Sequence, residues 1–199
     1  MKDSDRVVTG IFGGSFDPPT FAHLKVGQFC LKHARIDELW FLPTSQNPLK
    51  QDYPATPSAL RLEMLQAALA PLPEIKIETV ELFRDTPAYT FDTIHELKRR
   101  EPDRAFVLIM GMDAFLSLPR WKHASELMKL VRFAVVPRPG MKQPKSSQIV
   151  DMDVIFLELP ELDISSTEVR SRIKQGRDVS DLAPASVLEL IKKYRLYHS

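Results

Sequence analysis

Short apolar runs rich in valine, isoleucine and phenylalanine alternate along the chain with longer stretches of helical periodicity. The runs predict strands at Val7–Phe12, Glu38–Leu42, Ile75–Glu81, Ala105–Gly111, Phe133–Val136 and Val154–Leu157. The stretches between and after them predict helices at Ala22–His33, Ser58–Ala70, Thr90–Arg100, Ser125–Leu130, Ser166–Gln175 and Ala185–Tyr194. Apolar strands that alternate with helices are typical of a parallel sheet with crossover helices. We therefore expect a doubly wound α/β fold, with helices on both faces of the sheet.

Proline and glycine mark where these elements begin and end. Pro184 stands at the start of the last helix, and Gly176 follows the preceding helix, where a left-handed cap is expected. The stretch Pro137–Ser147 holds three prolines, a glycine and two lysines, which predicts a loop or flap. A chain of 199 residues is long enough for one α/β domain and too short for two. We expect a single domain, residues 1–199.

Composition and charge exclude several classes of protein. The chain is 44% hydrophobic and 27% charged, as soluble globular proteins are, and its net charge of +1 gives no reason to expect a nucleic-acid partner. Cys30 is the only cysteine, which excludes an intramolecular disulfide and a thiolate metal cluster. No apolar run approaches the roughly 20 residues that span a bilayer, and the first residues lack the apolar core of a signal peptide. We expect a cytoplasmic protein with no membrane partner. The sequence does not decide whether the protein forms a homo-oligomer.

The segment from Gly10 to His23 carries the strongest chemical signal. The first predicted strand runs into a helix through Gly13-Gly14, which lack a Cβ and let the backbone approach a ligand. Pro18-Pro19 is expected in the first helical turn, and Thr20 then lies on the same helix face as His23. Helix N-termini bind anions, and ligands of doubly wound sheets bind at the carboxyl ends of the strands. The segment therefore predicts a phosphate site.

Two familiar phosphate motifs are absent. A nicotinamide-dependent dehydrogenase would carry G-x-G-x-x-G and an acidic residue after the second strand, where this chain has Pro43. The chain also lacks G-x-x-x-x-G-K-[ST], which excludes a P-loop.

A second helix start, Ile164-Ser165-Ser166-Thr167-Glu168-Val169-Arg170, is predicted to form a capping box between Ser165 and Glu168. Its remaining N–H groups are available to bind a second part of an anion.

Both segments resemble elements of the HxGH nucleotidyltransferase superfamily. Thr20 and His23 fit its [H/T]-x-G-H signature, although Ala22 stands where glycine is usual, and the second helix start matches its I-S-x-T-x-[IV]-R element. Further segments occur in the order found in bacterial nicotinate-nucleotide adenylyltransferases, which the whole chain resembles. These segments are Pro43–Lys50, Tyr89–Ile94, Gly111–Asp113 followed by Trp121, Arg138–Gly140, and a C-terminal part that includes Asp181-Leu182, Pro184 and Leu196-Tyr197. One departure is Leu49, where many members have histidine.

The resemblance implies a Rossmann-like fold of the nucleotidyltransferase type and a reaction between ATP and nicotinate mononucleotide. The products are nicotinate adenine dinucleotide and pyrophosphate, and the acceptor's own phosphate is the nucleophile. That phosphate is already anionic, so no protein base is required. Mg²⁺ is expected to be coordinated mainly by oxygens of the ATP phosphates, with no protein metal ligand.

The resemblance also assigns site residues. Catalytic roles fall on His23, Thr20, Lys50 and Arg170. ATP binding falls on Gly13, Gly14, Ser15, Phe16, Asp17, His23, Gly111, Asp113, Ile164, Ser165, Ser166, Thr167 and Arg170. Binding of nicotinate mononucleotide falls on Lys50, Tyr89, Thr90, Asp113, Trp121 and Arg138.

Two other interpretations stay open at this point. Thr20 in place of histidine is compatible with another member of the superfamily, such as a phosphopantetheine adenylyltransferase. Ala22 and Leu49 are compatible with a protein that binds nucleotide without turnover. The sequence does not decide between nicotinate and nicotinamide mononucleotide as acceptor.

Overall fold

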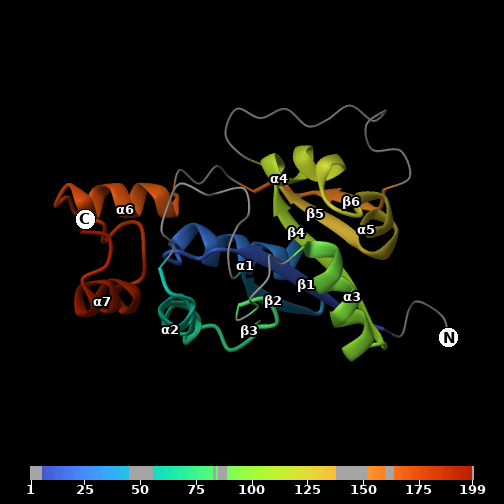
Figure 1. The fold of residues 1–199 in the computed structure, drawn as a ribbon, viewed down its shortest axis with the longest axis horizontal. Helices are drawn as coiled ribbons and strands as arrows, with labels where there is room; N and C mark the ends of the chain where they lie inside the picture. Colours follow the sequence, from blue (N-terminus) through green and yellow to red (C-terminus); the bar gives the residue numbers. More distant parts are fainter. Residues whose placement is uncertain are drawn as a thin grey trace.

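The computed structural model describes residues 6–44, 56–82, 84, 89–137, 152–159 and 164–198. Within them six strands form one sheet in the order β3-β2-β1-β4-β5-β6, and every neighbouring pair is parallel (Figure 1). The strands are β1 (Val7–Gly14), β2 (Glu38–Pro43), β3 (Ile75–Ile77), β4 (Arg104–Gly111), β5 (Arg132–Val136) and β6 (Val154–Phe156). The doubly wound, Rossmann-like fold expected from the apolar pattern is confirmed.

All of the predicted helices are present, with ends that differ from the prediction by one residue at most. The helices are α1 (Phe21–His33), α2 (Ser58–Leu69), α3 (Thr90–Arg100), α4 (Met112–Ser117), α5 (Ala124–Leu130), α6 (Ser166–Lys174) and α7 (Ala185–Tyr194). Helix α4 and the 3-10 turn after it, Leu118–Arg120, were not predicted because they are too short to show a helical period. The third strand was predicted too long: it ends at Ile77, and a turn closed by the Leu82 N–H on the Thr79 carbonyl follows.

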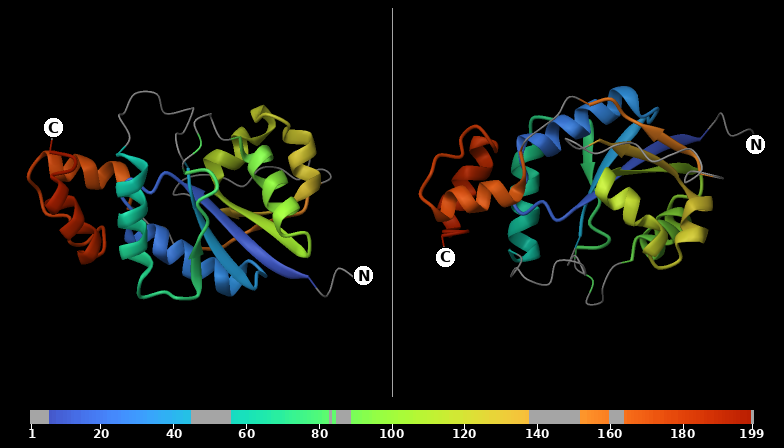
Figure 2. Two further views of the ribbon diagram at one scale, coloured as in Figure 1. Left: turned by 60° about the horizontal axis from the view of Figure 1, so that its bottom comes forward. Right: turned by 90° about the horizontal axis from the view of Figure 1, so that it is seen from above.

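Side chains of each strand alternate between two apolar layers, one on either face of the sheet. In β4, Leu108 joins a layer that includes Leu97 of α3 and Leu127 of α5. The next residue, Ile109, joins a layer with Cys30 of α1 and Leu65 of α2. Helices α1 and α2 thus cover one face and α3, α4 and α5 the other, as the two views in Figure 2 show. Cys30 is buried as expected, and burial raises the pKa of its thiol to about 12.

Helices α6 and α7 lie together at one end of the molecule, far from the N-terminus and next to α2 (Figures 1 and 2). A third apolar cluster holds them there, and it includes Met64 and Ala68 of α2, Val169 of α6, Ile191 of α7 and Tyr197 beyond α7. Gly176, at φ 66°, provides the left-handed position predicted after α6. That residues 1–199 form a single domain stays a prediction. No helix of the described part has the length and apolar character needed to cross a membrane.

The strand order reverses between β1 and β4. From β1 the chain moves outward through β2 and β3, then crosses to β4 on the other side of β1 and continues to β5 and β6. The two strands are paired along their length, with Phe12 opposite Ile109, so their carboxyl ends at Gly14 and Gly111 lie at the same edge of the sheet. Ligands of open α/β sheets bind at such a reversal. This edge therefore holds the candidate site.

Candidate active site

The turn between β1 and α1, residues 15–20, begins with two glycines in different surroundings. A Cβ on exposed Gly13 would meet nothing within 4 Å, whereas a Cβ on Gly14 would lie 3.1 Å from the ring of Phe16. Phe16 itself is 1% exposed and has a φ of 46°, a conformation that costs a non-glycine residue free energy. The space beside Gly13 is thus open to a ligand, and the turn behind it is held in a strained shape.

Helix α1 starts after the two prolines, so the prediction that Pro18-Pro19 forms its first turn is wrong. Thr20 is the N-cap, with φ −129° and ψ 165°, and the Phe21 N–H donates to the carbonyl of Leu182 at 2.9 Å. Asp17, which could have capped a helix beginning at the prolines, directs its carboxylate to other partners described below. Contacts with distant segments therefore set where this helix begins.

His23 is held by Thr20 in a way that selects one tautomer of its ring. The Thr20 N–H donates to Nδ1 of His23 at 3.0 Å, and the Thr20 hydroxyl oxygen lies 2.8 Å from the same nitrogen. A ring nitrogen that accepts a backbone N–H carries no proton, so in the neutral imidazole the proton is on Nε2. The ring of Phe16 packs edge-to-face against that of His23, with centroids 5.1 Å apart. His23 is therefore a fixed hydrogen-bond donor through Nε2.

The structure brings the start of α6 against this turn. The Ser166 hydroxyl donates to the carbonyl of Pro18 at 2.8 Å, and Nη1 of Arg170 donates to the carbonyl of Asp17 at 2.7 Å. Nη2 of Arg170 also lies 3.4 Å from the Thr167 hydroxyl. The two segments predicted to bind ATP phosphates, about 150 residues apart in the chain, thus meet directly.

The predicted capping box of α6 forms in one direction. The side chain of Ser165, the N-cap, accepts the Glu168 N–H at 3.1 Å. The Glu168 carboxylate pairs with Nε of Arg172 at 2.6 Å, one helical turn onward. The Glu168 carboxylate thus forms an ion pair along the helix instead of accepting the Ser165 N–H, as it would in a full capping box. Ile164 precedes this cap and packs at the edge of the third apolar cluster.

A buried polar group behind the turn was not predicted from the sequence. Asp17, 3% exposed, accepts the Thr56 N–H at 3.1 Å and the Tyr197 hydroxyl at 2.5 Å. Arg61, 1% exposed, donates through Nε to the carbonyl of Thr56 at 3.0 Å and through Nη1 to the carbonyl of Ser15 at 2.8 Å. Burial lowers the pKa of Arg61, and the negative charge of Asp17 partly offsets that effect. No local motif marks Arg61, because a lone arginine on a helix usually faces solvent.

These contacts decide which backbone atoms of the turn can meet a phosphate. The carbonyl oxygens of Ser15, Asp17 and Pro18 are the groups that would repel an anion, and each accepts a hydrogen bond from Arg61, Arg170 or Ser166. Two of these donors are guanidinium groups, which add positive charge beside the turn. The arrangement favours binding of a phosphate at the open side of the turn.

On the β4 side, four of the other predicted residues lie at helix starts, and Trp121 follows the 3-10 turn Leu118–Arg120. Gly111 ends β4 and is the N-cap of α4, and Asp113 is exposed in the first turn of that helix. Tyr89, 40% exposed, is the N-cap of α3, and Thr90 is its first residue. Half-buried Trp121 donates its indole N–H to the Ser117 hydroxyl at 3.0 Å.

Lys122, which no sequence motif indicates, joins the segment before α5 to the start of α3. Its Nζ lies 4.3 Å from the centroid of the Tyr89 ring and 3.5 Å from Oδ2 of Asp92. Tyr89 and the residue after Trp121 are therefore side by side, although they come from opposite ends of the α3-β4-α4 unit. The ammonium group of Lys122 is thus shared between the Tyr89 ring and the Asp92 carboxylate at the start of α3.

A buried carboxylate supports the start of α3 from beneath. Glu81, 3% exposed, accepts the Thr93 hydroxyl at 2.5 Å, and Arg84 contacts Thr93 and pairs with Glu96. Burial raises the pKa of Glu81, more than the Thr93 hydroxyl and the Arg84 charge lower it. The first turn of α3, next to Tyr89 and Thr90, is thereby tied to the segment after β3.

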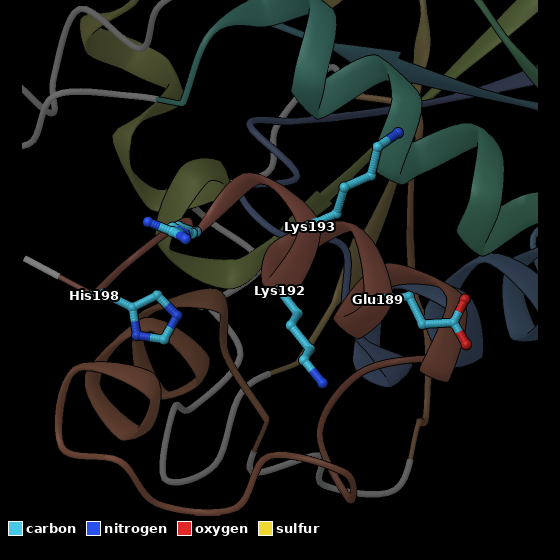
Figure 3. A pocket seen from close by; sticks show the side chains of 5 residues that line it. Glu189, Lys192, Lys193 and His198 are labelled. Carbon is cyan, nitrogen blue, oxygen red and sulfur yellow. The ribbon is translucent and has the colours of Figure 1, made fainter.

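Two predicted site residues, Lys50 and Arg138, lie outside the described residues. Over the part of the chain that is described, no group of three or more histidine, cysteine, aspartate or glutamate side chains could hold a metal ion. A shallow hollow of about 800 Å³ lies elsewhere, at the end of α7 (Figure 3). It is lined by Glu189, Lys192, Lys193, Arg195 and His198, whose labelled side chains point in different directions in Figure 3. The hollow contains none of the predicted site residues.

Comparisons with known proteins show which family this chain resembles. Residues 11–172 match the family model described as cytidylyltransferase-like. The nicotinate-nucleotide adenylyltransferase of Bacillus subtilis is 38% identical over 190 residues, which cover 96% of this chain and 98% of that protein. A probable nicotinate-nucleotide adenylyltransferase of Geobacillus thermodenitrificans is 40% identical over 188 residues, 94% of this chain and 85% of that protein. The solved Plasmodium falciparum nicotinic acid mononucleotide adenylyltransferase in complex with NaAD shares the fold, with a TM-score of 0.80 and 24% identity over 96% of this chain and 97% of that one.

Proposed function

Since this chain belongs to the cytidylyltransferase-like family and to the nicotinate-nucleotide adenylyltransferases, we propose that it transfers AMP from ATP to nicotinate mononucleotide. The products are nicotinate adenine dinucleotide and pyrophosphate. The observation that carries the proposal for this chain is the meeting of the β1–α1 turn with the start of α6, through Arg170 and Ser166. That meeting gathers helix N-termini and a guanidinium group where a triphosphate can bind.

The transfer is a direct in-line displacement. An oxygen of the mononucleotide phosphate forms a bond to the α-phosphorus of ATP, while the bond from that phosphorus to the bridging oxygen of pyrophosphate breaks. The attacking oxygen is already anionic at neutral pH, so no protein side chain has to remove a proton. The protein's contribution is to align the two phosphates and to stabilise the charge that develops on the α-phosphate and on pyrophosphate.

His23 and Arg170 are the side chains that we assign to this charge. The Nε2–H of His23 donates to the α-phosphate, and Thr20 holds the ring in that tautomer through Nδ1. Arg170, with the N–H groups of the α6 start at Ser165–Thr167, binds the β- and γ-phosphates. Lys50 is assigned to the reacting phosphates between the two substrates.

The remaining ATP contacts are backbone contacts from the turn. The residues are Gly13, Gly14, Ser15, Phe16 and Asp17, joined by Gly111 and Asp113 at the end of β4 and by Ile164 before α6. The open space beside Gly13 supports a close approach of the nucleotide there.

For the acceptor, Trp121 is assigned to stacking on the pyridine ring, and the N–H groups at Tyr89 and Thr90 to its carboxylate. Lys122, 4.3 Å from the Tyr89 ring, adds a positive charge on the same side and favours the acid over the amide. Asp113 accepts from a ribose hydroxyl, and Arg138 binds the mononucleotide phosphate.

Mg²⁺ is proposed to arrive as the ATP complex. The carboxylate of the turn, Asp17, already accepts hydrogen bonds from Thr56 and Tyr197, and the described site offers donors and positive charge for phosphate oxygens. This donor set suits an ion that keeps its waters and phosphate oxygens as ligands. When bound, the ion withdraws charge from the β- and γ-phosphates of the leaving pyrophosphate.

The experiment is an acceptor panel with the purified protein, ATP and Mg²⁺. Nicotinate mononucleotide, nicotinamide mononucleotide and phosphopantetheine are supplied separately, and both pyrophosphate and the adenylylated product are measured. We expect turnover with nicotinate mononucleotide and its loss in His23→Ala. Turnover with phosphopantetheine alone would assign the chain to a different branch of the superfamily. ATP binding with no product from any acceptor would show a nucleotide-binding protein without transferase activity.

A further inference from the structure

We infer that Tyr197, close to the C-terminus, is a positioning residue for this reaction: its hydroxyl holds the Asp17 carboxylate and thereby the β1–α1 turn that binds ATP. The inference rests on the proposed function and extends it to a residue outside the site motifs. Tyr197 follows α7 and lies 180 positions after Asp17 in the chain.

The hydroxyl of Tyr197 takes part in a chain of buried hydrogen bonds. It donates to Oδ1 of Asp17 at 2.5 Å and accepts from the Thr56 hydroxyl at 3.2 Å. The Thr56 N–H donates to the other carboxylate oxygen, and Nε of Arg61 donates to the Thr56 carbonyl. Tyr197 is 8% exposed and Asp17 3%, so water does not readily replace a lost partner.

The backbone at both ends of this link is in a conformation that non-glycine residues avoid. Tyr197 has a φ of 67°, and Phe16, next to Asp17, has a φ of 46°. Such residues persist only where surrounding contacts hold them, and they concentrate at functional sites. The hydrogen bond between the Tyr197 hydroxyl and the Asp17 carboxylate therefore helps to hold both conformations, that of Phe16 in the turn and that of Tyr197 after α7.

The hydrogen bond from Tyr197 to Asp17 adds to three other side-chain contacts that hold the β1–α1 turn. Arg61, Arg170 and Ser166 donate to the carbonyls of Ser15, Asp17 and Pro18. The Asp17 side chain is held separately, by the Tyr197 hydroxyl and by the Thr56 N–H. Without the hydroxyl, one carboxylate oxygen of Asp17 remains buried with fewer donors. We expect the turn to shift to recover a partner, and its N–H groups to lose their alignment with the phosphates.

The ring and the hydroxyl of Tyr197 have separable roles. The ring packs in the third apolar cluster with Val169, Val187 and Ile191, and Tyr197→Phe preserves that packing. Tyr194→Phe is a matched control, because Tyr194 is 38% exposed and its hydroxyl donates to exposed Glu63 at 3.3 Å. Both variants remove one tyrosine hydroxyl from the same end of the chain.

The test measures kcat, the KM for ATP and the KM for nicotinate mononucleotide in both variants. For Tyr197→Phe we expect kcat/KM for ATP to fall about tenfold or more, the loss of one hydrogen bond to a charged group, with the KM for nicotinate mononucleotide within about twofold. For Tyr194→Phe we expect wild-type values. Hydrogen exchange followed by mass spectrometry should show faster exchange in residues 13–20 of Tyr197→Phe and unchanged exchange in α7.

Wild-type kinetics and exchange in Tyr197→Phe would overturn the inference. Equal losses in the two variants would also overturn it, because the effect would then come from general loosening of the C-terminal segment. If the wild-type protein adenylylates no acceptor, the proposed function fails, and the exchange comparison together with ATP affinity still decides whether Tyr197 holds the turn.

Discussion

Gly13→Ala tests whether the glycine at this position is needed for the approach of a ligand or for packing within the protein. Gly13 lies in β1, is exposed, and would place its new Cβ in space that has no protein atom within 4 Å. Alanine in a strand loses less conformational entropy on folding than glycine, so we expect the free energy of unfolding to stay the same or rise by up to about 1 kcal/mol. If ATP approaches the backbone there, the methyl group displaces it.

The magnitude of the binding loss follows from what the methyl group disrupts. Losing one backbone hydrogen bond to a charged phosphate costs about 1.5–3 kcal/mol, which raises the KM for ATP by roughly ten- to a hundredfold. The KM is measured from pyrophosphate release at saturating nicotinate mononucleotide. The free energy of unfolding is measured by urea titration with tryptophan fluorescence.

Gly10→Ala, in the same strand, is the control with the opposite expectation. Its Cβ would lie 2.6 Å from Cδ1 of Ile36 and 3.0 Å from Cδ1 of Ile109, both buried. Overpacking costs about 1–3 kcal/mol, partly offset by the entropy term, so we expect a loss of stability near 1 kcal/mol and an unchanged KM. A wild-type KM for ATP in Gly13→Ala, or a stability loss as large as that of Gly10→Ala, would refute the reasoning.

Three further substitutions test other parts of the site. His23→Ala should lower kcat by about 10²–10³, because it removes a donor to developing charge, while His33→Ala at the other end of α1 should leave kcat unchanged. Lys122→Met should lower kcat/KM for nicotinate mononucleotide by about three- to tenfold and spare nicotinamide mononucleotide, as compared in parallel rate assays. Burial raises the pKa of Glu81 above its ordinary 4.5, so folding stability is fully present below that value and falls as the pH rises through the raised pKa. Urea unfolding at pH 5 and pH 8 should show this fall in the wild type and a flatter profile in Glu81→Gln, and equal profiles would contradict the assigned cause.

The fold was predictable because its central strands are buried on both faces. Residues 106–110 of β4 are all buried, and such strands read as continuous apolar runs in the sequence. The prediction failed where tertiary contacts decide the outcome. β-Branched residues recur after Ile77, at Thr79 and Val80, and favour a longer strand. β3 nevertheless ends at Ile77, because the chain turns at Thr79 and buries Glu81 against Thr93.

The candidate site was predictable only where its residues stand close together in the chain. Thr20 and His23 are three residues apart, so spacing alone places them on one face of a helix. Ser165 and Arg170 lie within two turns of one helix start, so a local motif can identify them together. The hydrogen bond from Tyr197 to Asp17 joins residues that are 180 positions apart in the chain, so no local sequence pattern indicates it. The same holds for Lys122 and Tyr89, which meet only because α3 and the segment before α5 are neighbours.

Charge at the turn accounts for the triphosphate binding that we propose for a chain with a net charge of only +1. Arg61 and Arg170 each donate to a carbonyl of the turn, and the same turn carries the carboxylate of Asp17. Arg61 is buried, so counterions screen its charge far less than they screen surface lysines. Asp17 has its own donors in Thr56 and Tyr197, and its negative charge partly offsets that of Arg61, so the two arginines and Asp17 together carry an excess of one positive charge. The polar group behind the turn therefore helps to fix its shape, and the net charge that it gathers favours an anion at the turn.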